Sequence, residues 1–174
     1  LHVVSRSGSL GLRYNVFDGN AWNGEFATNN NVAYYPAIAV ESDGTVHLAW
    51  LEGTPFTGNT LPISEGTFGA WLHGPTVAEV VEGYHTDLAV AADGSRHVVF
   101  YDDNLRNVRY ATDSSGPWAL SALVDSGIFD SRPSVALDGR GVVHIAAGVF
   151  TGSDPLLYFT DDSGEFASTT IDPE

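Results

Sequence analysis

The chain has 174 residues and a formal net charge of −15, from 22 acidic and 7 basic residues. This charge repels phosphate backbones and anionic lipid surfaces, so nucleic acids and membranes are excluded as expected partners. Hydrophobic residues make up 43% of the sequence, as in ordinary globular proteins, which excludes extended disorder. Cysteine and methionine are absent, so disulfides are excluded, and we expect a processed or excised chain that is secreted or extracytoplasmic.

One sequence pattern, which ends in a histidine, occurs three times in full, over residues 35–47, 85–97 and 132–144. A fourth copy at the start of the chain, with its histidine at His2, lacks the first half of the pattern. The histidines that end the four copies are 45, 50 and 47 residues apart. This spacing is typical of four-stranded propeller blades. The sequence therefore predicts an all-β β-propeller segment of about four blades, three complete and one without its innermost strand. The blades are expected over about residues 1–30, 31–81, 82–127 and 128–174.

The first strand of each complete blade is predicted over residues 37–40, 87–90 and 134–137. Each has alanine at the same central position, namely Ala39, Ala89 and Ala136. Neighbouring blades converge on the axis of a propeller, so a small side chain is expected at this position.

The turn that follows carries Asp43-Gly44 in one blade and Asp93-Gly94 in the next. Asp-Gly supplies the positive φ angles of a two-residue hairpin, so a turn of that kind is predicted. The second strands are expected over residues 46–51, 97–101 and 143–149, which are apolar on both faces. Such strands occur where other structure covers both faces of a sheet.

Four histidines share one position of the second strand, namely His2, His47, His97 and His144. Equivalent positions of different blades lie far apart around a propeller, so a shared metal is not expected. Each imidazole should instead bond a neighbouring strand or turn, which fixes one tautomer. The sequence predicts no metal and no other cofactor, apart from a calcium ion that the oxygen ligands of Asp102 and Asp103 would help to bind.

The third strands are expected near residues 12–14, 61–64, 108–110 and 156–158. Pro62 interrupts the second of these, and proline removes a hydrogen-bond donor from the ladder. That strand is therefore predicted to be short or bulged.

Aromatic residues follow the turns after the third strands, namely Trp22, Trp71, Trp118 and Phe166. The last turn reads Thr160, Asp162 and Gly164 at alternate positions before Phe166. This pattern resembles the Asp-box of sialidase-like propellers, which is Ser/Thr-x-Asp-x-Gly followed by an aromatic residue. The resemblance implies a propeller of BNR repeats in which the box is a structural hairpin, and it does not imply sialidase activity.

Two positions just before each first strand vary in chemistry while the strand behind them stays constant. They hold most of the candidate ligand-binding residues, which are Tyr34, Tyr35, Tyr84, His85 and Arg132. These side chains should ring one mouth of the channel, together with Glu52, Asp102 and Asp103 from the loops after the second strands. Such a cluster suits a polar, partly anionic or sugar-like ligand, and a channel that binds only water is the alternative.

The leading hypothesis is a non-catalytic repeat scaffold that binds a polar small molecule or glycan at this mouth. It would assemble with further blades, from a second copy or from the rest of a longer protein. The first alternative is a fragment of a sialidase-like glycoside hydrolase, with Arg132 and Tyr35 or Tyr84 as the nearest candidates for its machinery. The second is a purely structural, self-assembling repeat protein, and a β-sandwich is the alternative fold.

Overall fold

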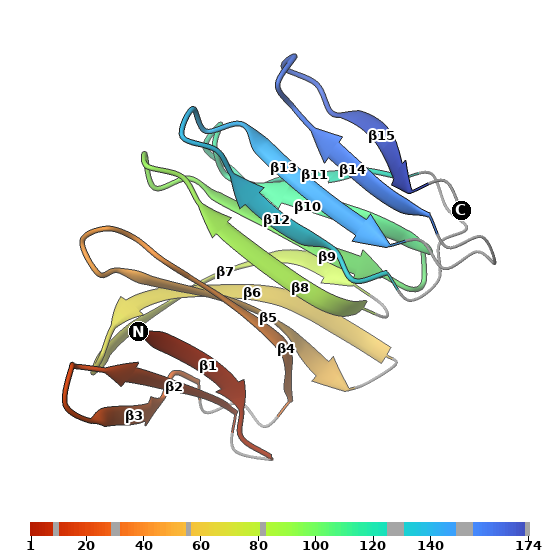
Figure 1. Cartoon of the computed structure of the whole chain (residues 1–174). Helices are drawn as coiled ribbons and strands as arrows, with labels where there is room; N and C mark the ends of the chain where they lie inside the picture. Colours follow the sequence, from red (N-terminus) through yellow and green to blue (C-terminus); the bar gives the residue numbers. More distant parts are fainter. Residues whose placement is uncertain are drawn as a thin grey trace.

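The structure is a computed structural model that describes residues 1–8, 11–28, 32–54, 57–80, 83–124, 131–148 and 155–172. In these residues the chain forms strands β1 to β15, which make four separate antiparallel sheets (Figure 1). Nowhere in the described part of the chain is there a helix long and apolar enough to cross a membrane. The fold is all-β, as the repeat predicts.

The first sheet has three strands, β1 (His2–Arg6), β2 (Leu12–Phe17) and β3 (Trp22–Phe26). The second has β4 (Ala33–Val40), β5 (Val46–Thr54), β6 (Thr57–Thr67) and β7 (Ala70–Val80). The third has β8 (Gly83–Val90), β9 (Arg96–Asp102), β10 (Asn107–Thr112) and β11 (Ala119–Ala122). The fourth has β12 (Ser134–Leu137), β13 (Val143–Gly148), β14 (Leu156–Thr160) and β15 (Ala167–Asp172).

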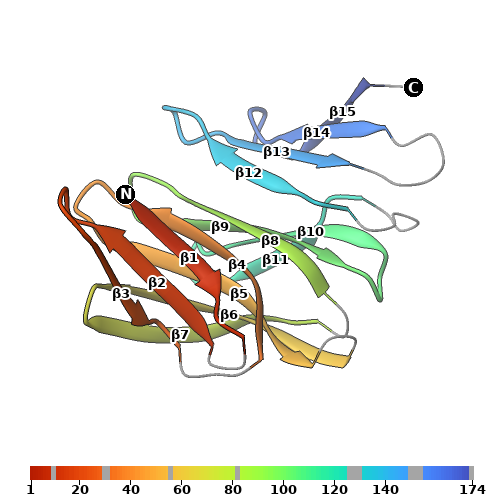
Figure 2. The same ribbon diagram turned by 60° about the horizontal axis from the view of Figure 1, so that its bottom comes forward.

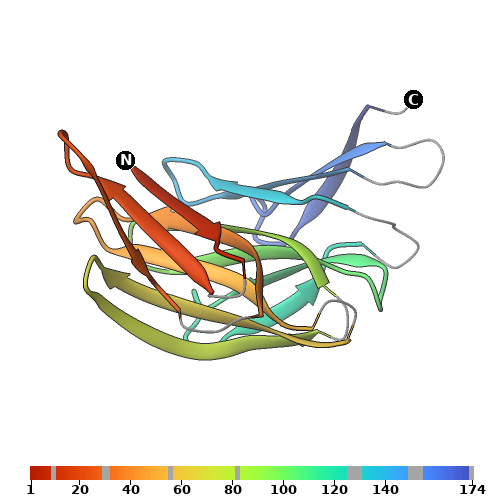
Figure 3. The ribbon, with the colours of Figure 1, turned by 90° about the horizontal axis from the view of Figure 1, so that it is seen from below.

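The four sheets are stacked around a shared inner edge. Strands β4, β8 and β12 lie side by side along this edge, and β1 lies next to β4 (Figures 1 and 2). The first and fourth sheets occupy opposite ends of the stack (Figure 3). Successive sheets packed through their inner strands make a propeller-like fold, and a β-sandwich of two facing layers is excluded.

Three hydrophobic clusters fill the spaces between successive sheets. On β5, Leu48 and Trp50 belong to the cluster against the first sheet, whereas Ala49 and Leu51 belong to the cluster against the third. All four side chains are buried. Both faces of this strand are therefore covered, which confirms the prediction made from its continuous apolar run.

The histidines of the second strands bond the structure around them. Nδ1 of the imidazole lies 2.5–2.6 Å from a tyrosine hydroxyl oxygen of the third strand in the pairs His2–Tyr14, His97–Tyr110 and His144–Tyr158. The second sheet has Ile63 in place of this tyrosine, and there Nε2 of His47 lies 2.6 Å from Oε1 of Glu41 instead. The predicted structural role of these histidines is confirmed.

The turn after the first strand differs from the predicted two-residue hairpin. Val40 and Val46 form the last pair of the ladder, so residues 41–45 lie in the loop. Gly44 has a φ of 93°, while Asp43 keeps a negative φ and accepts the N–H of Thr45 at 2.8 Å through Oδ1. A two-residue hairpin of this type needs a positive φ at both turn residues, and here only the glycine has one. The single positive φ and the hydrogen bond to the aspartate side chain are typical of a longer loop built on a type I turn. The prediction of a two-residue hairpin is therefore wrong.

The strand that contains Pro62 is bulged. The pairing of β6 with β7 shifts on both sides of this proline, as expected for a residue that cannot donate to the ladder. The strand is not short, because β6 extends over 11 residues. The bulge confirms the prediction of a short or bulged strand.

Candidate functional site

A pocket of about 230 Å3 lies where strands of the first three sheets meet. Its lining residues come from β1, β4, β5, β6 and β8, and are Arg6, Tyr34, Tyr35, Leu51, Asn59, Gly83 and Tyr84. We call it the tyrosine pocket. Three of the residues selected from the sequence, Tyr34, Tyr35 and Tyr84, are thus brought together.

Two β-bulges shape one wall of the tyrosine pocket. The ladder of β4 shifts between Tyr34 and Ala37, and that of β8 shifts between Tyr84 and Thr86. At the bulges Tyr35 and His85 adopt φ angles of 48° and 50°, which non-glycine residues rarely do. Bulges turn side chains out of the regular alternation, and strained backbone is concentrated at functional sites. The same backbone device thus occurs at equivalent positions of two sheets.

The aromatic rings at this wall contact one another. The ring of Tyr35 lies 4.8 Å from that of His85 and 5.8 Å from that of Tyr84, the latter edge to face. The hydroxyl of Thr86 donates to the carbonyl oxygen of Tyr35, so a hydrogen bond joins β8 to β4 beside Tyr35 and His85 in the sequence. The wall is a connected aromatic surface that two sheets hold in place.

Arginine supplies the positive charge of the tyrosine pocket. The guanidinium carbon of Arg6, at the end of β1, lies 4.1 Å from the ring centroid of Tyr34. Stacking on a ring fixes the plane of a guanidinium and leaves the N–H groups at its edge directed outward as donors. The pocket thus offers hydrogen-bond donors beside aromatic faces.

Asn59 contributes a hydrogen-bond acceptor to the tyrosine pocket. Its side chain is 5% exposed and lines the tyrosine pocket from β6. Its Oδ1 atom is buried and has no hydrogen-bond partner within the described part of the chain. Buried polar atoms are nearly always bonded, and one left without a partner is destabilising. A ligand hydroxyl or amine in the pocket would satisfy this oxygen.

Asp102 and Asp103 hold the loop between β9 and β10. The carboxylate of Asp102 is buried, lies 3.3 Å from Arg109 and accepts the N–H of Leu105 at 3.1 Å. Asp103 accepts the hydroxyl of Tyr101 at 2.9 Å. Across all described residues, no three His, Asp or Glu side chains form a group that could hold a metal ion.

Glu52 and Arg132 lie outside the tyrosine pocket. Glu52 accepts the indole N–H of Trp50 at 3.3 Å and lines a different hollow of about 380 Å3, together with Pro62 and His73. Arg132 is exposed just before β12. These two predicted residues are therefore not among those that line the tyrosine pocket.

The sequence reasoning missed Arg6 and Asn59. The repeat could have indicated Arg6. This residue comes four positions after His2, as Leu51 comes four positions after His47, and both residues line the pocket. No pattern in the sequence indicated Asn59, because it precedes residues 61–64, where the third strand was expected. Strand β6 begins earlier than expected, at Thr57, and so includes Asn59.

Comparison with known proteins gives a likeness of fold. No protein-family model and no curated protein matches the sequence. The structure resembles the lectin of Aleuria aurantia in complex with α-methyl-L-fucoside, with a TM-score of 0.75 and 13% identity over 98% of this chain and 56% of that one. Another structure of this lectin is described as a six-bladed β-propeller.

Two further likenesses are weaker. A fucose lectin from Kordia zhangzhouensis in complex with methyl-fucoside has a TM-score of 0.56 and 15% identity, over 79% of this chain and 99% of that one. A GH43 β-1,3-galactosidase in complex with galactodeoxynojirimycin also has a TM-score of 0.56, with 13% identity over 92% of this chain and 68% of that one. The chain thus has a propeller-like fold and spans 56% of the length of the Aleuria lectin.

Proposed function

We propose that this chain is a non-catalytic propeller segment that binds a glycan, or a small molecule of similar polarity, in the tyrosine pocket. The observation that carries the proposal is the buried Oδ1 of Asn59, an acceptor without a partner in a pocket walled by aromatic rings. A sugar presents hydroxyl donors beside apolar C–H faces. A sugar hydroxyl can donate to Oδ1 of Asn59, and a C–H face can pack on the rings of Tyr35 and Tyr84.

The size and charge of the site narrow the ligand class. The volume of about 230 Å3 is below the roughly 300 Å3 at which sites for drug-sized ligands begin, so one sugar unit is the natural occupant. The net charge of −15 disfavours anionic sugars. The ligand proposed is therefore a neutral terminal sugar, and methyl-fucoside is the first to test because two structures of this fold contain it.

The proposal includes assembly with further blades. Among the described residues, the first and fourth sheets each have a neighbouring sheet on one side only (Figure 3). Large hydrophobic side chains are exposed on both, among them Val3 at 41% and Ile171 at 56%. Exposed apolar patches mark interaction surfaces, so we infer that other sheets of the same kind cover these two faces.

A glycan array followed by calorimetric titration with methyl-fucoside tests the binding proposal. Tyr35→Gly removes a ring from the wall, and glycine tolerates the φ of 48° without strain. We expect affinity to fall about tenfold or more, which corresponds to roughly 1.4 kcal/mol. Phe68→Ala is the matched control, because this aromatic side chain is 48% exposed in the β6–β7 turn and does not line the pocket.

Asn59→Leu separates binding from stability. It removes a buried acceptor that lacks a partner, so the free energy of unfolding should stay equal or rise, while glycan affinity falls. The absence of any glycan ligand, or wild-type affinity in both pocket variants, would refute the proposal. Turnover of a chromogenic sialoside or galactoside would replace it with a hydrolase.

A further inference from the structure

The internal interfaces of the stack share one aromatic contact. In the second, third and fourth sheets, the aromatic side chain after the third-to-fourth turn packs against the cluster shared with the preceding sheet or on a third-strand tyrosine of that sheet. The ring of Trp71 meets Tyr14 edge-on at 5.1 Å, and that of Phe166 meets Tyr110 edge-on at 4.9 Å. Trp118 packs on the cluster that contains Ile63, the residue equivalent to these tyrosines. An aromatic side chain from this position therefore contributes to the packing in each of the three spaces between sheets.

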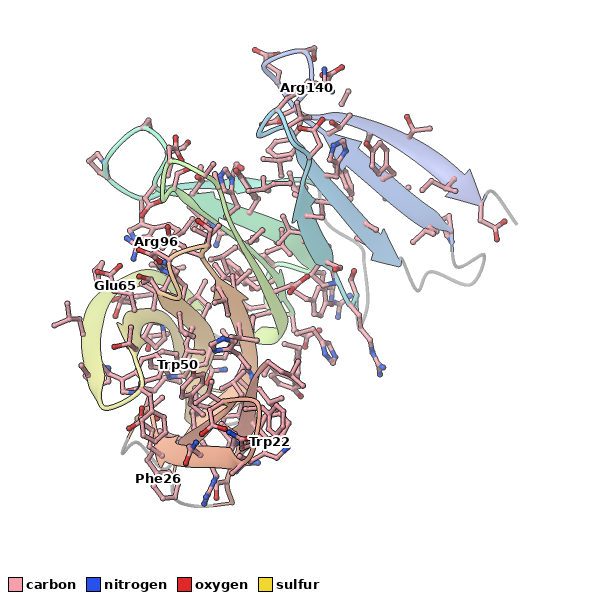
Figure 4. All side chains as sticks on the ribbon, turned by 60° about the vertical axis from the view of Figure 1, so that its left-hand side comes forward. Trp22, Phe26, Trp50, Glu65, Arg96 and Arg140 are labelled. Atoms are coloured by element: carbon pink, nitrogen blue, oxygen red, sulfur yellow. The ribbon has the colours of Figure 1, made fainter. Side chains whose placement is uncertain are left out.

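The two ends of the stack each hold half of this contact. The receiving residues Tyr14, Ile63 and Tyr110 are 6% exposed or less, whereas Tyr158 at the equivalent position of the fourth sheet is only half-buried. At the other end, Trp22 is 52% exposed, and its ring lies 5.5 Å from that of Phe17 in its own hairpin. Figure 4 shows Trp22 and Phe26 at the end of the molecule away from the other three sheets.

A second position repeats the same contrast. The residue after each recurring histidine faces the preceding sheet, and Leu48, Val98 and Ile145 are all fully buried there. The equivalent Val3 in the first sheet is 41% exposed. The outer face of the first sheet thus repeats the chemistry of three buried interfaces without a sheet to cover it.

We propose that these two end faces bind each other between copies of the chain, head to tail, with Trp22 of one copy packed on Tyr158 of the next. The inference deepens the assembly part of the proposed function by naming the partner, and it does not depend on glycan binding. A second copy is the proposed partner because each end face resembles one side of the three interfaces between successive sheets of this chain. The two end faces together supply both sides of such an interface. Such a contact joins different surfaces of the two copies, so it leads to a ring when the rotation closes and to a filament when it does not.

Sedimentation velocity of the whole chain at micromolar concentration tests this pairing. The wild-type chain should sediment as an oligomer, and Trp22→Ala or Tyr158→Ala should each sediment as a monomer. Leu72→Ala is the control, because this side chain is 68% exposed on β7 and is not part of either end face. Circular dichroism of each variant should match the wild type, which separates loss of the interface from loss of the fold.

Mixing the two variants gives a sharper result. Trp22→Ala keeps an intact fourth-sheet face, and Tyr158→Ala keeps an intact first-sheet face. An equimolar mixture should therefore form a 1:1 dimer that grows no further, although each variant alone is monomeric. A monomeric wild-type chain, or a mixture that stays monomeric, would overturn the inference. Methyl-fucoside titration of Trp22→Ala reports on the tyrosine pocket separately, so failure of one proposal is distinguishable from failure of the other.

Discussion

At the scale of single residues, one repeated histidine has different surroundings in different sheets. His97 is buried between the third and fourth sheets, whereas the side chain of His144, on the end face, is 32% exposed. Burial lowers the pKa of His97 below 6.5 and raises the pKa of its partner Tyr110 to about 12. Both shifts favour the neutral pair, as expected for a hydrogen bond kept away from water.

The lowered pKa of His97 makes stability depend on pH. The unfolded chain protonates this imidazole near pH 6.5, while the folded chain resists protonation, so the contribution is complete above pH 6.5 and is lost as the pH falls below it. The nearby carboxylates of Asp161, Asp113 and Asp93 oppose the shift without cancelling it. Urea unfolding on both sides of pH 6.5 should show a larger acid-induced loss for the wild type than for His97→Gln. Equal losses would show that another group controls the dependence.

At the scale of secondary-structure elements, polar side chains join neighbouring sheets. The carboxylate of Asp87 on β8 accepts the hydroxyl of Ser134 at 2.7 Å and the N–H of Val135 at 2.9 Å, both on β12. Arg96 on β9 lies 3.3 Å from Glu65 on β6, and Figure 4 shows these two side chains near each other between their sheets. Hydrogen bonds and ion pairs have a defined geometry, whereas hydrophobic packing is non-directional. These contacts therefore favour one orientation of each sheet relative to the next.

Removing the Asp87 contact should loosen the fourth sheet. Asp87→Ala leaves the N–H of Val135, which is 7% exposed, without its acceptor. The expected cost is about 1–3 kcal/mol in the free energy of unfolding, measured with urea. Asp43→Ala serves for comparison, because Asp43 accepts the N–H of Thr45 within one exposed turn and joins no sheets. A smaller loss for Asp87→Ala than for Asp43→Ala would contradict this role.

At the scale of the whole molecule, charge opposes the association that the end faces favour. A chain with a net charge of −15 repels its own copies, and salt screens that repulsion over a Debye length of about 10 Å at 0.1 M. Added sodium chloride should therefore shift the sedimentation equilibrium toward the oligomer. A shift toward the monomer would mean that ion pairs, and not apolar contacts such as that of Trp22, hold the copies together.

The repeat itself made much of this fold readable from the sequence. Alternating side chains, turn glycines and the recurring histidines follow from strand geometry, which is local and has a period of two residues. Ala39 and Ala89 were expected where sheets converge, and each packs against the cluster shared with the following sheet. Ala136 is exposed, because none of the sheets in the described residues follows and covers the fourth.

The sequence by itself determined which segments are strands, how they join into sheets and which residues recur for structural reasons. The sequence selected the three tyrosines of the tyrosine pocket, and only the tertiary structure decided the rest of it. Its residues Arg6, Asn59 and Tyr84 come from three different sheets, and the left-handed backbone at Tyr35 depends on a bulge that no local signal marks. Strand formation depends on neighbouring residues, whereas a pocket between sheets depends on how distant strands pack, and a single sequence pattern does not encode that packing.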